Sequence, residues 1–234
     1  MTNKLTLELD GSRLEFVAQR VLVVGYTGRD AAQVQAHIAE LESQGIAPPE
    51  RVPSLYALEA SWVTTDAELH FPVPYVSGEV EPALLFRSDR LDDALVSVIV
   101  DFTDREEERR SIARSKLLPK PLSRRVWRYS DVAAVWDRIA LRSWTDTRSD
   151  RELYQSGTLA QLLAPPDLLA RLDYPGGLGS GTPAALEGTV LLMGTVPLRA
   201  REFAFTDYFA CELETPDGRK LSYECRVERE KDDR

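Results

Sequence analysis

The residues best suited to chemistry are three carboxylates between positions 79 and 101. Glu79 and Glu81 are two residues apart, at the start of a segment that continues with apolar residues. Because side chains alternate along a strand, both glutamates are expected on one face, with Val80 on the other. Two like charges side by side are unfavourable unless solvent separates them, one is protonated, or a cation lies between them. This spacing therefore indicates a divalent-metal site.

A third carboxylate, Asp101, could complete that site. It follows residues 95–100, a run rich in β-branched residues that predicts a buried strand with Asp101 at its exit. Ligands that are all oxygen suit a hard cation such as Mg²⁺ or Mn²⁺. The alternative is that these acids are solvated surface residues, as most acidic side chains are.

A candidate base lies upstream, on a helix predicted over residues 29–42. The apolar and small residues of that segment recur at helical spacing, and Gly45 and Pro48 end it. His37 and Glu40 are three positions apart and so share a face of the helix. Glu40 could orient the imidazole, or the pair could hold a water molecule, as a general base requires. The alternative is a surface histidine beside a surface glutamate.

The composition is that of a globular protein and excludes two classes of partner. The 234 residues are 43% hydrophobic and 29% charged, with a formal net charge of −9. This acidity argues against nucleic-acid binding, which needs clustered Lys and Arg, and no apolar run approaches the length of a membrane span. The N-terminus lacks the apolar core of a signal peptide. We therefore expect a cytoplasmic protein with a small-molecule partner.

The two cysteines are expected to be reduced thiols in the core. Cys211 and Cys225 lie in segments that predict neighbouring strands, and no His or further Cys is near them to make a zinc site.

The order of the predicted elements indicates a mixed α+β fold in a single domain, 1–234. Its N-terminal part, 1–50, holds a hairpin over residues 4–25, turning at Asp10, and the helix described above. The rest, 51–234, forms the metal-binding core. In that core we expect strands at 186–195, 208–213 and 221–227, and helices at 105–116, 131–140 and 158–172.

Several details of that core are also predicted. Ile112 and Ala113 should face inward from the charged helix, and Pro165 and Pro166 should interrupt the last helix. Residues 50–76 read as irregular, 176–181 as a flexible loop and 228–234 as a frayed tail.

In this order, the residues resemble landmarks of the fumarylacetoacetate hydrolase superfamily. Its members typically have a His-x-x-Glu near the start, matched here by His37 and Glu40. They also have a Glu-x-Glu metal pair, matched by Glu79 and Glu81.

The later landmarks follow in the same order. The family segment Asn-Asp-x-Ser-x-Arg, which supplies a metal-binding Asp, is matched by residues 100–105 and so places Asp101 and Arg105. Lys116 resembles the lysine that follows this segment. Gly194 and Thr195 resemble the first two residues of a late Gly-Thr-Pro loop.

The sequence departs from the family pattern in three places. Val100 stands where the Asn is usual, Val196 stands where the Pro of the loop is usual, and residues 55–58 contain no counterpart of a lysine in a Phe-x-Lys-Pro context. The chain therefore resembles a short, divergent branch of the superfamily.

The resemblance implies a mixed β-roll or β-sandwich, one Mg²⁺ or Mn²⁺, and a homodimer. It implies a hydrolase or lyase acting on a carbon–carbon bond of a 2-oxo or 1,3-dicarbonyl acid, of the acylpyruvate hydrolase or oxo-acid decarboxylase type. In that scheme the catalytic residues are His37, Glu40 and Lys116, the substrate-binding residues are Arg105, Gly194 and Thr195, and the metal ligands are Glu79, Glu81 and Asp101.

Two alternatives stay open on the sequence. The same site could serve an oxo-acid tautomerase, or the chain could be a catalytically silent protein of this fold that binds a dicarboxylate. The missing Phe-x-Lys-Pro element favours the silent protein. The His-x-x-Glu pair speaks against it, because a passive binder has less need of a base.

Overall fold

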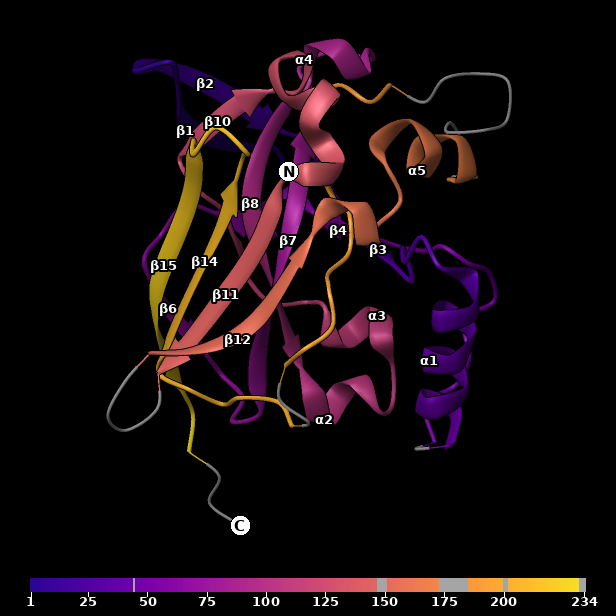
Figure 1. Ribbon diagram of the computed structural model, residues 1–234. Coiled ribbons are helices and arrows are strands. Elements are labelled where there is room, and N and C mark those ends of the chain that lie inside the picture. Colours follow the sequence, from indigo (N-terminus) through magenta and orange to yellow (C-terminus); the bar gives the residue numbers. More distant parts are fainter. Residues whose placement is uncertain (44, 147–150, 173–184, 200–201, 232–234) are drawn as a thin grey trace.

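The structure is a computed structural model that describes residues 1–43, 45–146, 151–172, 185–199 and 202–231. Its strands form an eight-stranded, a five-stranded and a two-stranded sheet, with short helices around them (Figure 1). The mixed α+β architecture built mainly on strands is confirmed.

The eight-stranded sheet has the order β2-β1-β10-β8-β7-β13-β3-β4. In that order its strands are Ser12–Ala18, Asn3–Leu9, Arg125–Arg128, Leu95–Asp104, Val76–Leu85, Thr189–Leu192, Arg20–Gly25 and Ser54–Glu59. β1 runs parallel to β10, and β13 runs parallel to β3, whereas the other neighbours are antiparallel. The N-terminal strands are therefore part of the same sheet as β7 and β8.

The five-stranded sheet has the order β12-β11-β14-β15-β6. Its strands are Arg151–Thr158, Ala140–Asp146, Tyr208–Glu214, Lys220–Arg229 and Glu68–Phe71. The two-stranded sheet pairs β5, Val63–Thr64, with β9, Lys120–Pro121.

The helices of the described residues are short, apart from the first. The α-helices α1 to α5 are Ala31–Ser43, Arg105–Glu108, Ile112–Ser115, Tyr129–Val132 and Pro165–Arg171. The 3-10 helices η1 to η4 are Ala60–Trp62, Leu91–Asp93, Ala133–Arg138 and Leu159–Gln161. No helix in this part of the chain combines the length and apolar character needed to cross a membrane.

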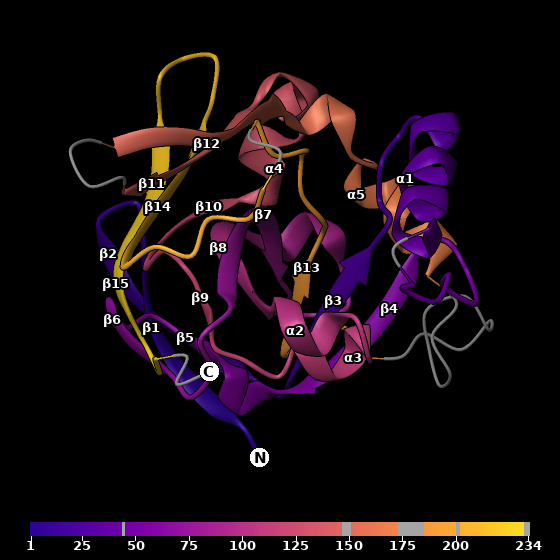
Figure 2. The same cartoon turned by 90° about the horizontal axis from the view of Figure 1, so that it is seen from below.

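Both faces of β7 and β8 are buried, which explains their nearly continuous apolar sequence. One face packs against the five-stranded sheet, through Val80, Val100, Phe102, Phe209 and Cys225. The other face packs with residues of β1, β2, β3 and β13, because the eight-stranded sheet curls around it. Figure 2, seen from below, shows the strands arranged around this interior, with α2 and α3 across the lower end of the roll.

The predicted N-terminal helix is confirmed as α1, which buries Val34 and Ile38. Gly45 follows it with φ of +87°, a conformation that favours glycine at a helix C-terminus. Figure 1 shows α1 at the right-hand edge of the molecule, outside both sheets. Cys211 and Cys225 are buried free thiols on neighbouring strands, as expected.

Two predictions about the core strands are wrong. Asp101 does not lie at a strand exit, because β8 pairs with β7 along its whole length and continues to Asp104. Residues 50–76 are not irregular, since they contain β4, η1, β5 and β6 and the start of β7. These short strands find their partners in β3, β9 and β15, and such pairing leaves little local signal in the sequence.

The predicted helices also need correction. Residues 105–116 form two helices, because the Ser111 side chain caps a new one, and the buried side is Ser115 and Lys116 rather than the exposed Ala113. Residues 131–140 continue α4 into a 3-10 helix and end at β11. Residues 158–172 are helical in two pieces, η4 and α5, as predicted, but the break precedes Pro165, which begins α5 because proline is suited to the first turn.

Two further differences concern strands, and one prediction is not tested. The hairpin of β11 and β12 was not predicted. β15 extends to Arg229, so part of the expected frayed tail is strand. The predicted loop at 176–181 lies outside the described residues.

Candidate active site

Glu79, Glu81 and Asp101 lie on the inner face of the curled sheet. Glu79 is paired directly with Asp101 in the register of β7 and β8, so their side chains point to the same side. Glu81 shares this side because it is two residues from Glu79. The three carboxylates lie in the half of β7 and β8 that leads to α2, because β8 ends at Asp104 and α2 begins at Arg105. The same-face arrangement expected from the alternation is what the register produces.

Asp101 is almost fully buried and is held by two lysines. Lys116 Nζ lies 2.5 Å from Asp101 Oδ2, and Lys120 Nζ lies 3.2 Å from Oδ1. Lys116 also donates a hydrogen bond to Thr103 Oγ1 at 2.9 Å, and Lys120 donates to the Phe102 carbonyl at 2.7 Å. Burial raises the pKa of Asp101, but the two lysines outweigh this effect and lower it. The carboxylate is therefore ionised.

The two lysines respond differently to burial. Burial lowers the pKa of Lys116, but the nearby Asp101 and Glu79 outweigh it, and the net pKa is raised. For Lys120, burial dominates and lowers the pKa to about 8, although Asp101 opposes this. Both side chains are ammonium ions at neutral pH.

Glu79 is held by Arg105, the first residue of α2. Arg105 Nη2 lies 2.9 Å from Glu79 Oε2, and Nη1 lies 2.9 Å from Glu108 Oε2. Arg105 Nε donates to Ser77 Oγ at 2.7 Å, and the Phe203 ring lies over the guanidinium at 3.9 Å. Burial lowers the pKa of Arg105, but Glu79 and Glu108 more than restore it, so the guanidinium stays charged.

Glu81 is the carboxylate of the cluster without a cationic partner. It is 3% exposed, and its Oε2 accepts a hydrogen bond from the Gly194 backbone N–H at 2.8 Å. No ion pair in the described part of the chain involves Glu81. Burial, and then the charge of Asp101, raise the pKa of Glu81 well above its ordinary value.

The Gly194–Thr195 segment is fastened to β7. Thr195 Oγ1 donates to the Val80 carbonyl at 2.6 Å and accepts from Gln155 Nε2 at 2.8 Å. Gln155 is fully buried and also accepts from the Val80 N–H at 2.9 Å. The fold therefore brings together seven of the residues predicted from the sequence, namely Glu79, Glu81, Asp101, Arg105, Lys116, Gly194 and Thr195.

His37 and Glu40 are placed differently, on the exposed side of α1. Their side chains are 59% and 67% exposed, and His37 Nδ1 lies 3.8 Å from Glu40 Oε2. The His37 ring lies 6.2 Å from the ring of Tyr26. Burial, then Tyr56 and Glu108, raise the pKa of Tyr26, while Lys116 lowers it. Tyr26 therefore lies near His37 and within electrostatic range of Glu108 and Lys116.

Sequence reasoning missed four residues of this region, namely Tyr26, Glu108, Lys120 and Gln155. Lys120 had a detectable signal, because it is a charged residue between two prolines in the otherwise apolar segment 117–122. Gln155 lies on β12, whose strand was itself not predicted. Glu108 and Tyr26 resemble ordinary surface residues in the sequence, and only tertiary packing brings them to the site.

The cluster suits a divalent cation in the type of its ligand atoms and in the common face from which they point. Its carboxylates offer only oxygen ligands from one face, Glu81 lacks a counter-ion, and Asp101 Oδ1 accepts no aligned hydrogen bond. Among the described residues, however, no three His, Cys, Asp or Glu side chains are already gathered as metal ligands. Arg105, Lys116 and Lys120 hold two of the carboxylates instead. The residues therefore fit a cation if one of these groups gives way.

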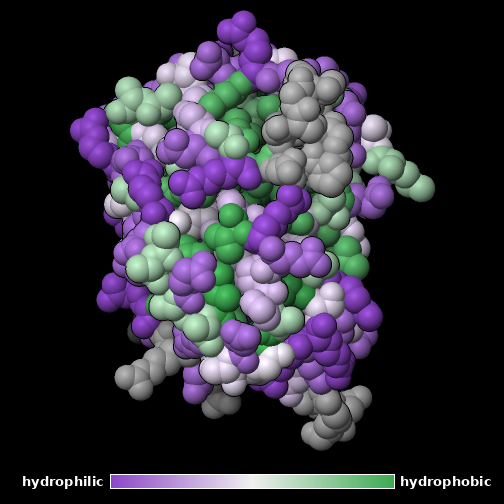
Figure 3. All heavy atoms as spheres, turned by 90° about the vertical axis from the view of Figure 1, so that its right-hand side faces the viewer, coloured by the Kyte–Doolittle hydropathy of each residue, from purple (hydrophilic) through white to green (hydrophobic). Residues whose placement is uncertain are grey.

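A cleft of about 350 Å³ adjoins the cluster. Glu108 lines it, together with Tyr56 and residues of the segments 46–51 and 109–113. Because Glu108 is bonded to Arg105, the cleft reaches the charged cluster through this pair. Figure 3 looks onto the face that carries α1, where apolar side chains run down the middle between hydrophilic ones.

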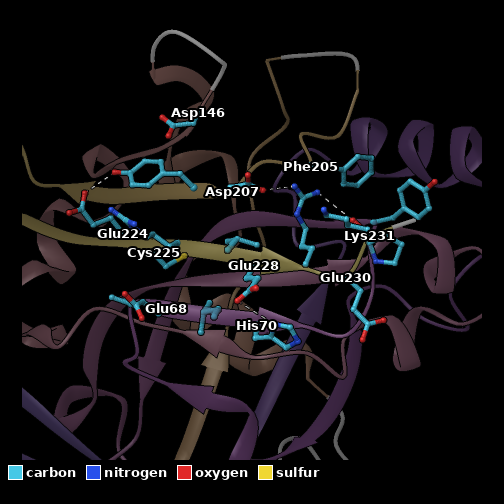
Figure 4. A pocket seen from close by; sticks show the side chains of 18 of the residues that line it. Glu68, His70, Asp146, Phe205, Asp207, Glu224, Cys225, Glu228, Glu230 and Lys231 are labelled. Atoms are coloured by element: carbon cyan, nitrogen blue, oxygen red, sulfur yellow. Dashed lines mark hydrogen bonds and ion pairs between the residues drawn. The ribbon is translucent and has the colours of Figure 1, made fainter. Parts of the chain in front are cut away.

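A larger groove of about 1470 Å³ lies away from the cluster, over β6, β14 and β15 (Figure 4). Its lining includes the pairs His70–Glu228, with Nδ1 and Oε2 3.6 Å apart, and Arg229–Asp207, with 2.8 Å between the charged atoms. None of Glu79, Glu81 and Asp101 lines either cavity. The smaller cleft includes Glu108, the ion-pair partner of Arg105, and we therefore place the candidate active site at the cluster and this cleft.

Comparison with known proteins bears on the fold and the family. A family model described as "Protein of unknown function (DUF2848)" matches residues 24–224. A search of curated proteins finds no match to the sequence.

Several solved structures are similar to the chain. A candidate fumarylacetoacetate isomerase/hydrolase from Oleispira antarctica is 20% identical, with a TM-score of 0.67 over 94% of this chain and 98% of that one. A candidate fumarylpyruvate hydrolase from Burkholderia cenocepacia is 17% identical, with a TM-score of 0.59 over 99% and 97%. A fumarylacetoacetate hydrolase family protein from yeast is 16% identical, with a TM-score of 0.58 over 91% and 94%. The β-roll fold expected from the resemblance is confirmed.

Proposed function

The chain belongs to the DUF2848 family and has the fold of the fumarylacetoacetate hydrolase superfamily, and we propose that it is a metal-dependent enzyme of oxo acids. Its reaction would be hydrolysis or lysis of a carbon–carbon bond in a 2-oxo or 1,3-dicarbonyl acid. The observation that carries the proposal is the buried cluster of Glu79, Glu81 and Asp101 beside a cleft. The solved structure described as a fumarylpyruvate hydrolase supports the substrate class.

The metal would be Mg²⁺ or Mn²⁺, held by the three carboxylates of the cluster. When bound, such an ion stabilises negative charge that develops on the carbonyl oxygen of a chelated 2-oxo acid. Glu81 is suited to the role because burial without a counter-ion disfavours its charge, and a cation would relieve this cost.

Basic residues around the cluster would bind the anionic end of the substrate. Lys116 Nζ has three N–H groups, of which Asp101 and Thr103 take two, so one is left to donate. Arg105 lies at the start of α2 beside Glu108, which lines the cleft. Gly194 and Thr195, which bond Glu81 and Val80, would also contact the substrate.

His37 would act as the general base, oriented by Glu40. It takes a proton from water, whose oxygen attacks a carbonyl carbon; the bond to the neighbouring carbon then breaks, and that carbon takes up a proton. Water is thus added across the carbon–carbon bond. In a tautomerase the same base would take the proton from carbon instead. Decarboxylation would need this base least.

The decisive experiment compares two histidine variants on a panel of acylpyruvates, oxaloacetate and related 2-oxo acids with Mg²⁺ or Mn²⁺. We expect His37→Ala to lose hydrolytic or tautomerase turnover while Mg²⁺ and oxalate affinity stay nearly unchanged. His70→Ala is the matched control, because His70 forms a comparable exposed pair with Glu228 away from the cluster. Equal turnover in both variants would exclude His37 as the base.

A second variant tests the metal. Asp101→Asn should weaken both Mg²⁺ binding and turnover, and Mg²⁺ should raise the Tm of the wild type by mass action but not that of Glu81→Gln. Absence of any shift at millimolar Mg²⁺ in the wild type would contradict the metal site.

The silent dicarboxylate-binding protein is the second candidate, and one observation favours it. His37 is exposed, and its ion-pair partner is Glu40 rather than a carboxylate of the cluster. If no acid of the panel turns over while oxalate binds through the metal, the silent binding protein is the better account.

A further inference from the structure

One carboxylate of the cluster, Asp101, already has two cationic partners, which is one more than its single charge requires. Asp101 is paired with two lysines, one at each of its oxygens. When all three carboxylates are ionised, as metal ligands must be, they and these two ammonium groups sum to a single negative charge, because Arg105 and Glu108 cancel. A bound divalent cation would convert this into a net positive charge, which is costly in a buried site.

Of the two lysines, Lys120 is the more deeply buried and the more firmly held in place. It is fully buried, whereas Lys116 keeps 8% of its surface. It lies on β9, which pairs with β5, and is flanked by two prolines that restrict the backbone. Its Nζ is fixed by the Phe102 carbonyl and Asp101 Oδ1, and Glu81 also acts on its charge. This ammonium therefore has no route to solvent without a change in the fold.

Resting on the metal site proposed above, we propose that Lys120 is a built-in competitor of the metal for Asp101, which makes tight metal binding depend on an anionic ligand. Lys120 Nζ lies 3.2 Å from Asp101 Oδ1, so a metal that binds this oxygen must compete with the ammonium group for it. A divalent cation entering alone meets the positive charge of Lys120. An oxo-acid carboxylate that enters with it supplies the missing negative charge and restores neutrality.

This arrangement predicts that the binding free energies of the metal and of an anionic ligand such as oxalate are coupled. Because binding free energies are reciprocal, the factor by which oxalate tightens metal binding equals the factor by which metal tightens oxalate binding. Part of that factor comes from chelation in any metal site. The part that depends on Lys120 should disappear when its charge is removed.

The experiment measures the affinity of Mn²⁺ by calorimetry, with and without oxalate, in three forms of the full chain. Lys120→Met removes the buried charge and keeps an unbranched chain of similar length. Lys4→Met removes the same charge from an exposed lysine of β1 that pairs with Glu15, and is the matched control. We expect Lys120→Met to bind Mn²⁺ alone at least about tenfold more tightly than the wild type, with a smaller coupling factor. Lys4→Met should match the wild type in both.

The outcomes separate this inference from the proposed function. If the wild type and Lys120→Met bind Mn²⁺ equally and with equal coupling, Lys120 is not a competitor, although the metal site stands. If neither form binds Mn²⁺ with or without oxalate, the metal site and this inference both fail. Should Lys120→Met not fold, Lys120→Gln is measured in the same way. If that variant does not fold either, wild-type coupling of less than about tenfold overturns the inference.

Discussion

Replacing Gly194 by Ala tests whether the backbone of the Gly194–Thr195 segment sets the position of Glu81. Gly194 has φ of +85°, and a Cβ placed there would collide with Thr27 Oγ1 and lie 3.1 Å from Thr27 Cβ. A left-handed conformation costs a non-glycine residue about 1–2 kcal/mol, and overpacking a buried site costs about 1–3 kcal/mol more. The expected loss in the free energy of unfolding is therefore about 2–5 kcal/mol.

Gly218 provides a matched control for the backbone term. Its φ is +86°, and a Cβ there would meet no heavy atom within 4 Å. Gly218→Ala should therefore lose only about 1–2 kcal/mol. Urea unfolding at equilibrium measures both variants, provided the m-value is unchanged.

A double variant isolates the steric term. Adding Thr27→Ala to Gly194→Ala should recover about 1–3 kcal/mol relative to the sum of the two single changes, because the colliding oxygen is gone. If Gly194→Ala and Gly218→Ala differ by less than about 0.5 kcal/mol, the close approach of Gly194 to Thr27 is not a constraint. Since the Gly194 N–H donates to Glu81, we also expect the stability loss to be accompanied by weaker Mg²⁺ binding.

Two further predictions concern the ion pairs and the assembly. Arg105→Met should cost about 3–5 kcal/mol in urea unfolding, because it leaves Glu79 and Glu108 partly buried without their cation; Arg87→Met, which breaks an exposed pair with Asp93, should cost no more than about 1 kcal/mol. Equal losses would mean that burial of the Arg105 pairs adds nothing. The homodimer implied by the family resemblance should persist at micromolar concentration in sedimentation, and a species with the mass of one chain would contradict it.

Local periodicity was enough to predict which residues share the carboxylate face. The two-residue spacing of Glu79 and Glu81 places both on one side of β7 regardless of what packs there. The same holds for α1, where helical spacing and a terminal glycine fix the extent of the helix. These signals survive because they depend on neighbours within a few residues.

Long-range pairing decided what the sequence could not predict. Asp101 lies inside β8 because β8 stays paired with β7 as far as Asp104. The register of this pairing is set by the turn that joins the two strands rather than by residues near Asp101. Lys120 reaches Asp101 only because β9 is held by β5, more than 50 residues earlier in the chain. Its two prolines indicate an extended backbone but not the direction of the side chain.

The two halves of the candidate site differ in how firmly they are held, and this separates the reactions proposed for them. The carboxylate cluster is buried and fixed by Lys116, Lys120 and Arg105, so binding a metal there requires only that one of these side chains gives way. The candidate base is on α1, and the chain is anchored just before this helix by Arg29. The Arg29 guanidinium bonds Asp137 at 2.7 and 2.8 Å, and the Arg29 backbone N–H donates to the Gln161 carbonyl.

Beyond that anchor, α1 buries few side chains, and His37 lies on its exposed side. A general base must come within hydrogen-bond reach of the proton that it takes. Hydrolysis or tautomerisation through His37 therefore requires α1 to approach the cluster, whereas decarboxylation at the cluster does not. A cross-link that holds α1 in its described position should abolish the first two reactions and leave decarboxylation of oxaloacetate, and loss of all three together would show that the cluster alone is insufficient.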